Sequence, residues 1–340
     1  MSAGKITVRV EKWYAGHKSA VSLTLDGPWS PYGPYQKVVE DVLKRNLHMD
    51  FEIVTSFYQS PDRLPIVDKM REDLIPHGIH FFGHGHWHIN HDKAGYDSSY
   101  VSFKKCYDLM KEWGLNPKAY AYPYSAGHRA ETQQANHDAG FLFARGGTYD
   151  FDKFFISAGD HWEPENWYFL PSVPVSSEVN QEQPRTHEEI VPLLDEDIEK
   201  GAWIIIMLHS VGVPKGYAYY PLSDFQKDLD YISTHDIWCN NLDVVGLYCK
   251  ERNHFSYDLQ YMNANKKGYE YQLKLSDGLD NQLYDQPLTI NFDLSEAPEI
   301  SSLIIVTGDS LNKSYQVENH AVQINMLPDE KAHTVFFEHG

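Results

Sequence analysis

Apolar strand patterns alternate with amphipathic helix patterns from residue 20 to about residue 235, and this alternation restricts the fold more than any other feature. It is typical of a parallel sheet, because each helix carries the chain back to the start of the next strand. The sheet is either open or closed into a barrel. Its strands are buried on both faces, which accounts for apolar runs such as Trp203–Leu208. The predicted strands are 21–25, 49–58, 79–86, 117–124, 141–147 and 202–210, and the predicted helices are 35–46, 63–78, 100–114, 130–140, 186–201 and 222–234.

After about residue 253 the pattern changes, and apolar and polar residues alternate with a period of two. Such strands have one buried and one exposed face, which is typical of an antiparallel sheet. We therefore expect two domains, a (β/α) domain over residues 1–252 and a small β-sandwich over residues 253–340. The predicted C-terminal strands are 269–275, 287–294, 302–308, 321–327 and 333–339.

The charge of the chain argues against two classes of partner. Its formal net charge is −19 at pH 7, whereas nucleic acids and anionic membranes are bound by basic surfaces. The sequence has no apolar run long enough to span a membrane, and the N-terminus has no apolar signal core. Three widely spaced cysteines form neither a disulfide framework nor a CxxC metal site. Aromatic residues make up 14%, which fits a groove that stacks on sugar rings as well as a Tyr-rich core.

One short segment, Gly78–His91, contains five histidines, and His77 directly precedes it. Imidazole nitrogens and carboxylate oxygens are typical zinc ligands, and a catalytic zinc keeps one position open for water. His84 and His88 are four residues apart, so on one helical turn they would meet at one metal. His84 and His86 have the spacing at which a strand or a tight loop points two side chains to one side. The segment predicts a metal site whose third ligand comes from elsewhere.

Reactive side chains follow several predicted strands. Asp26, the histidine segment, Tyr124 and His209 each come directly after one. The carboxyl ends of parallel strands meet at one rim, where the sites of such folds lie. Asp26 is the best candidate for the third ligand, although an Asp-Gly pair is also a common turn. His80, inside an apolar strand, and His91, at the edge of the segment, are weaker candidates.

Four segments stand in order along the chain: AVSLTLDGPWS, GIHFFGHGHWH, AYAYPYSAG and IIIMLHS. Their order and rough spacing resemble the characteristic segments of the NodB-type polysaccharide deacetylases, or carbohydrate esterase family four. The resemblance covers about residues 5 to 253. It implies a distorted (β/α) barrel and a divalent metal, zinc first, with cobalt, nickel and manganese as alternatives. It also implies a reaction, the removal of N- or O-acetyl groups from a polysaccharide or oligosaccharide.

The resemblance further implies which residues act. Asp26, His84 and His88 match the metal ligands, and Gly78 stands six residues before His84, as is usual in the family. His209 matches the general acid that protonates the leaving group. The backbone N–H of Tyr124 matches the donor that stabilises the tetrahedral oxyanion.

The first motif departs from the family pattern. The family has two adjacent aspartates there, a catalytic base and then a metal ligand, whereas this chain has only Asp26, with Leu25 in place of the base. That alignment uses Gly27–Pro28; if a residue has been lost instead, Asp26 does one of the two jobs but not both. The arginine that holds the base in many members is Ala121 here. These departures imply reduced activity.

Other residues near the strand ends are candidates for supporting roles. Asp150 or Asp152 would replace the base or orient the general acid, and His86 is another replacement base. Otherwise His86 and Trp87 fall at variable positions of the second motif, behind the metal ligands or in the substrate groove. Arg145 is expected to contact substrate.

The sequence therefore favours a metal-dependent hydrolase that removes acetyl groups from a carbohydrate. One alternative is a catalytically impaired relative that binds glycans, which the missing aspartate favours. Another is a different metal-dependent amidohydrolase, which the His-x-His pattern allows. The expected partner is an acetylated carbohydrate, and a homo-oligomer is left open. A periplasmic or secreted protein whose signal has been removed is favoured over a cytoplasmic one.

Overall fold

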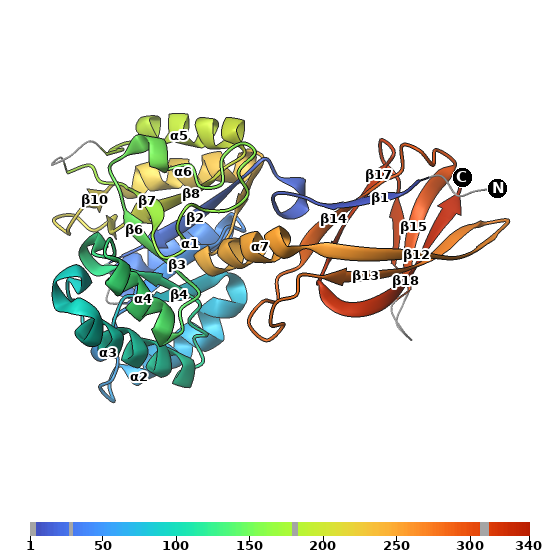
Figure 1. The fold of residues 1–340 in the computed structure, drawn as a ribbon. Coiled ribbons are helices and arrows are strands. Elements are labelled where there is room, and N and C mark those ends of the chain that lie inside the picture. Colours follow the sequence, from blue (N-terminus) through green and yellow to red (C-terminus); the bar gives the residue numbers. More distant parts are fainter. Residues whose placement is uncertain (1–4, 27–29, 179–182, 307–312) are drawn as a thin grey trace. The chain divides into compact units, whose positions relative to one another are not determined.

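The computed structural model describes residues 5–26, 30–178, 183–306 and 313–340. Seven parallel strands between residues 19 and 208 follow one another around a single sheet (Figure 1). They are β2 (Ser19–Leu25), β3 (Met49–Ile53), β4 (Ile79–Gly83), β5 (Ala119–Ala121), β6 (Phe143–Gly147), β7 (Leu170–Pro174) and β8 (Trp203–Leu208). Each pairs with the next in the chain, and β8 pairs back with β2. The sheet is thus closed, and the predicted (β/α) barrel is confirmed.

Helices lie around the outside of the barrel and connect its strands (Figure 1). They are α1 (Gln36–Lys44), α2 (Leu64–Lys69), α3 (His91–Glu112), α4 (Ala130–Ala139), α5 (His187–Lys200) and α6 (Leu222–Thr234), and α7 (Leu242–His254) comes after them in the chain. The helix predicted over residues 63–78 is shorter in the structure, where α2 ends at Lys69. Met70–Leu74 then forms a π turn and Ile75–His77 a 3-10 turn. Two further short pairings use β11 (Ile237–Cys239), beside β2, and β9 (Ser210–Val211) with β10 (Tyr219–Tyr220).

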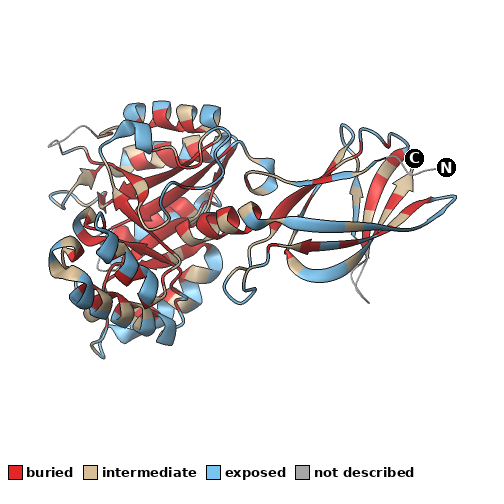
Figure 2. Cartoon of the chain, in the orientation of Figure 1, coloured by how far each residue is buried: buried red, intermediate tan, exposed pale blue. Residues whose placement is uncertain are grey.

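The barrel strands are buried along most of their length (Figure 2). Every residue of β2, β3 and β8 is buried. A strand between an inner core and an outer layer of helices has no exposed face, so apolar side chains on both sides stabilise it, each by about 1.5–3 kcal/mol. Against this apolar background, a carboxylate inside a strand such as Glu52 of β3 is unusual.

A second compact unit contains two antiparallel sheets. The five-stranded sheet has the order β12 (Ser256–Asn265), β13 (Gly268–Ser276), β18 (Asp329–His339), β15 (Ile300–Val306) and β16 (Lys313–Gln316). The three-stranded sheet has the order β1 (Thr7–Val10), β14 (Leu288–Asp293) and β17 (Ala321–Met326). Phe292 and Phe337 join the two sheets, with ring centroids 5.8 Å apart.

The division of the chain differs from the expected boundary at residue 252. The barrel unit spans Lys18–Gly246, and the residues up to His17 belong with Leu247–Gly340. The reason is strand pairing: β1 lies antiparallel to β14, with Val8 opposite Phe292. Among the described residues, no helix combines the length and the apolar character needed to cross a membrane.

Candidate metal centre

Loops at the carboxyl ends of the barrel strands enclose a cavity of about 820 Å³. Asp26 follows β2, His84 and His88 follow β4, Tyr124 follows β5, and His209 follows β8. All five line this cavity. The parallel strands thus bring residues that lie far apart in the sequence to one rim.

Asp26, Glu52 and His84 form the densest group in this cavity. Their ligand atoms all lie within 4.8 Å of one another, and the three residues are only 5%, 6% and 3% exposed. Leu25 pairs with Phe51, so the next residues along β2 and β3, Asp26 and Glu52, are neighbours at the strand ends. Buried carboxylates and an imidazole at this spacing are a donor set that fits a divalent cation.

The orientation of His84 suits a ligand. Its Nδ1–H donates to the carbonyl oxygen of Ala121 at 2.8 Å. A carbonyl oxygen can only accept, so the ring proton lies on Nδ1 and Nε2 is left to bind a cation. Nε2 lies 3.0 Å from Oε2 of Glu52. Burial lowers the pKa of His84 to about 3.

Arg145 holds Asp26. The guanidinium of this arginine, in β6, donates to Oδ1 of Asp26, and it is fully buried with its charge over the ring of Phe82. Burial by itself would raise the pKa of Asp26, but the charge and hydrogen bond of Arg145, together with His84 and His209, outweigh it, so this pKa is below its ordinary value. Arg145 does not line the cavity, and the expected substrate contact is replaced by an ion pair. Gly27–Pro28, used to align this motif, lie outside the described residues.

His88 lies beside the buried group rather than in it. It is exposed, and its ring centroid is 5.0 Å from that of His84 and 4.7 Å from that of Tyr124. Among the described residues, its nitrogens do not join the set of ligand atoms within 4.8 Å of one another. The segment between His84 and His88 is a loop and not the helical turn expected, because Gly85 adopts a left-handed φ of 93°.

His209 lies at the end of β8, with its ring edge-on to Tyr217 at a centroid distance of 5.0 Å. Burial, supported by the charge of Arg145, lowers the pKa of His209 against the opposing effect of Asp26. Within the described part of the chain, Nδ1 of His209 is buried without a hydrogen-bond partner. The expectation that Asp150 or Asp152 orients this ring is therefore not met.

Tyr124 is the central residue of the turn Pro123–Ser125 and has a left-handed φ of 59°. Tyr124 is 68% exposed, and it lines the cavity. Amides at the start of a helical turn have no acceptor within that turn, so the Tyr124 N–H is at a position that suits an oxyanion donor. The side chains of Tyr122, Tyr149 and Tyr217 also line the cavity.

Two predicted supporting residues lie away from the cavity. His86 is buried behind the loop, where its Nδ1 is 2.9 Å from Oγ1 of Thr55. Trp87 is 43% exposed and lies under the Nζ of Lys105, 5.4 Å from the ring centroid. His86 as a replacement base and Trp87 as a groove residue therefore do not agree with the structure.

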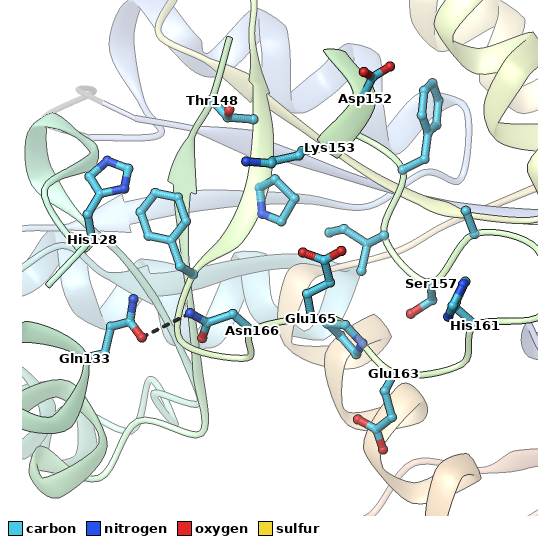
Figure 3. A pocket seen from close by; sticks show the side chains of 16 residues that line it. His128, Gln133, Thr148, Asp152, Lys153, Ser157, His161, Glu163, Glu165 and Asn166 are labelled. Atoms are coloured by element: carbon cyan, nitrogen blue, oxygen red, sulfur yellow. Dashed lines mark hydrogen bonds between the residues drawn. The ribbon is translucent and has the colours of Figure 1, made fainter. Parts of the chain in front are cut away.

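Asp150 and Asp152 also lie away from the buried group. Asp150 is exposed and pairs with Lys153 at 3.3 Å. Asp152 lines a second cavity of about 500 Å³, shown in Figure 3, whose wall shares His128 and Thr148 with the first. Neither aspartate is placed to act as the base.

A second group of potential ligands lies at the amino-terminal ends of the strands. Asp50, His80 and Asp243 have ligand atoms within 4.8 Å of one another. They already have partners: His80 Nδ1 lies 2.9 Å from Asp243, and Asp50 accepts from the amide of Leu242 at 2.7 Å. Burial by itself would lower the pKa of His80, but the charge and hydrogen bond of Asp243, together with the Asp50 charge, outweigh it and raise this pKa to about 9. We interpret this group as a hydrogen-bonded network that fixes the start of α7.

Glu52 is the residue that the sequence analysis missed. The available signal was a pair of acidic residues, Asp50 and Glu52, inside the otherwise apolar strand Met49–Ile53. A charged side chain is rarely buried without a partner or a cation, so its position in a barrel strand marked it as unusual.

Neither a family model nor a curated protein matches this sequence. Solved structures match its fold. A provisionally named polysaccharide deacetylase from Mycobacterium smegmatis has a TM-score of 0.54 at 13% identity, covering 72% of this chain and 94% of that chain. A family 4 carbohydrate esterase from Streptomyces lividans in complex with acetate has a TM-score of 0.44 at 12% identity, covering 67% and 94%. Together with the closed seven-strand barrel, the first of these likenesses identifies the fold: this chain contains the (β/α) barrel of the polysaccharide deacetylases.

Proposed function

We propose that this protein is a metal-dependent hydrolase that removes acetyl groups from an oligosaccharide or polysaccharide. The observation that supports it is the buried Asp26–Glu52–His84 group in a cavity at the carboxyl ends of the barrel strands. Zinc is the first candidate, since imidazole and carboxylate are its usual ligands in hydrolases, and cobalt, nickel and manganese are alternatives.

A divalent cation bound here would polarise the acetyl carbonyl and acidify a water molecule. Of the two carboxylates, Asp26 and Glu52, one would hold the cation with His84 and the other would take a proton from the attacking water. The water oxygen adds to the acetyl carbon, and the Tyr124 amide donates to the developing oxyanion.

His209 completes the reaction by giving a proton to the leaving nitrogen or oxygen as its bond to the acetyl carbon breaks. The products are acetate and a free amine or alcohol. Burial lowers the pKa of His209, so its protonated form is a stronger acid than a free imidazolium. The proton on the carboxylate then returns to solvent, and His209 is protonated again for the next cycle.

The aromatic wall favours a carbohydrate substrate. Tyr124, Tyr149 and Tyr217 line the cavity and are 68%, 46% and 78% exposed, and such rings offer apolar faces with a polar tip. The cavity volume of about 820 Å³ is within the range of roughly 300–1,000 Å³ for small-molecule sites. The net charge of −19 disfavours polyanionic glycans, so a neutral or basic glycan is the expected substrate.

The test combines metal analysis with acetate release. Purified protein is expected to retain about one equivalent of metal and to release acetate from N-acetylated chitooligosaccharides or from acetylated xylan. His84→Ala is expected to lose both properties. Acetate release by the metal-free protein, or release unaffected by His84→Ala, would contradict the proposal.

One specific observation favours a second candidate, a catalytically impaired glycan-binding relative. The first motif carries a single aspartate, and a buried arginine engages it. This candidate predicts binding of the same oligosaccharides without acetate release. A periplasmic or secreted location is part of the leading proposal, because polymeric glycans lie outside the cytoplasm, and cell fractionation tests it.

A further inference from the structure

We propose that Glu52 is the carboxylate ligand of the metal, and that Asp26, held by Arg145, is the residue that takes the proton from water. This assignment rests on the proposed function and gives each of the two buried carboxylates a separate role. It also moves the carboxylate ligand from the end of β2, where the sequence analysis placed it, to β3.

Glu52 and His84 are in direct contact. Oε2 of Glu52 and Nε2 of His84 are 3.0 Å apart, and the His84 proton lies on the other ring nitrogen, facing Ala121. Two lone pairs that face each other at this distance repel unless a proton or a metal cation lies between them. Ligand atoms about 2.0–2.2 Å from one zinc lie roughly 3–3.5 Å apart, so the observed spacing fits a shared ion.

Asp26 lies in a different environment from Glu52. Its Oδ1 accepts from Arg145, whose guanidinium is fully buried and cannot move aside into solvent. A divalent cation on the same carboxylate would be repelled by this fixed positive charge, and in a buried site that repulsion is only weakly screened. Asp26 lines the cavity, where its carboxylate can accept a proton from a water molecule.

Glu52 and His84 are both held rigidly by the main chain. Glu52 belongs to β3, which pairs with β4 over its whole length, and the amide of His84 donates to the carbonyl of Ile53 at 2.9 Å. The two proposed ligands are therefore fixed by main-chain hydrogen bonds of adjacent strands. A ligand on a strand, and one hydrogen-bonded directly to that strand, are positioned more accurately than ligands on free loops.

The experiment separates the two carboxylates by metal affinity and by turnover. The variants are Glu52→Gln, Glu52→Asp and Asp26→Asn, with Glu40→Gln on the exposed face of α1 as the matched control. Zinc affinity is measured by competition with a chromophoric chelator, the absorption spectrum is recorded with cobalt in place of zinc, and acetate release is measured with excess zinc. Far-UV circular dichroism and thermal unfolding confirm that each variant is folded.

We expect Glu52→Gln to weaken zinc binding by more than about 100-fold and to change the cobalt spectrum. Glu52→Asp keeps a carboxylate, so it should recover part of the affinity. Asp26→Asn should bind zinc within about tenfold of wild type and leave the cobalt spectrum unchanged, while acetate release falls by roughly 10²–10⁴-fold. The control should match wild type in every assay.

The reverse pattern, with zinc binding lost in Asp26→Asn and kept in Glu52→Gln, would overturn the assignment. Loss of zinc in both variants would also overturn it, since Asp26 would then be a ligand. If wild type binds zinc but releases no acetate, the proposed function is refuted. The zinc affinities of the Glu52 and Asp26 variants would still decide the ligand assignment. Wild type that binds no metal would refute both.

Discussion

The ion pair between Arg145 and Asp26 gives the sharpest prediction for stability. Both side chains are almost completely buried, and Arg145→Met would remove the positive charge while leaving the Asp26 carboxylate inside the barrel. Breaking a buried ion pair by removing one partner costs about 3–5 kcal/mol, because the remaining charge has lost its compensation. For a unit of this size, this corresponds to a fall in Tm of roughly 6–20 °C.

The assay is urea unfolding of the metal-free protein, followed by tryptophan fluorescence and circular dichroism, with a chelator present throughout. Lys227→Met is the control, because Lys227 forms exposed pairs with Asp224 at 3.2 Å and Glu188 at 3.5 Å. Exposed pairs contribute about 0–1 kcal/mol. The double variant Arg145→Met/Asp26→Asn should be about 1–3 kcal/mol more stable than Arg145→Met alone, because it no longer contains the unpaired negative charge of Asp26.

Two outcomes would refute this reasoning. One is a loss of stability in Arg145→Met no larger than in Lys227→Met, which would mean that the Asp26 carboxylate reaches solvent or another cation. The other is a double variant less stable than Arg145→Met, since removing the orphaned charge would then bring no relief.

Three further predictions concern single residues. His209→Asn should lower kcat for acetate release by roughly 10²–10⁴-fold, with zinc content unchanged in elemental analysis. Gly85→Ala should lower the free energy of unfolding by more than Gly95→Ala. Both glycines have a positive φ, so either substitution costs about 1–2 kcal/mol in backbone strain. Only at Gly85 is there a steric clash as well, since a Cβ there would lie 2.7 Å from the Trp87 carbonyl oxygen, whereas open space surrounds Gly95. The pKa of His80 is raised to about 9, so its contribution to the free energy of unfolding is complete below about pH 6.5 and is lost as the pH rises through 9. In urea unfolding measured across this pH range, His80→Asn should remove that pH dependence.

Most of the barrel could be predicted from the sequence, because its strands are apolar runs separated by helices with clear stop residues. The exception is β7, Leu170–Pro174, which was not predicted. Pro171 and Pro174 argue against predicting a central strand there, since proline has no backbone N–H to donate to a neighbouring strand. In the structure this strand pairs on both sides, with β6 and β8, so the closure of the barrel overrides the local preference.

The site could be predicted in part. Asp26, His84 and His209 directly follow strands, and that position can be predicted from the sequence. The position of Glu52 depends on the register between β2 and β3, which no local pattern specifies. Arg145 was expected to contact substrate, but its direction depends on which face of β6 meets the barrel interior, and a strand buried on both faces gives no such signal.

The strand pairing of β1 has a consequence for how the chain is made. Thr7–Val10 leaves the ribosome before the barrel, yet its partner, Leu288–Asp293, follows only after the whole of Lys18–Gly246. The barrel segment is complete and able to collapse while this early strand still exposes two unpaired edges, a state that invites wrong pairing with other chains. A shortened chain that keeps the first residues and lacks the last ones would carry this liability permanently, whereas residues 18–246 alone would avoid it.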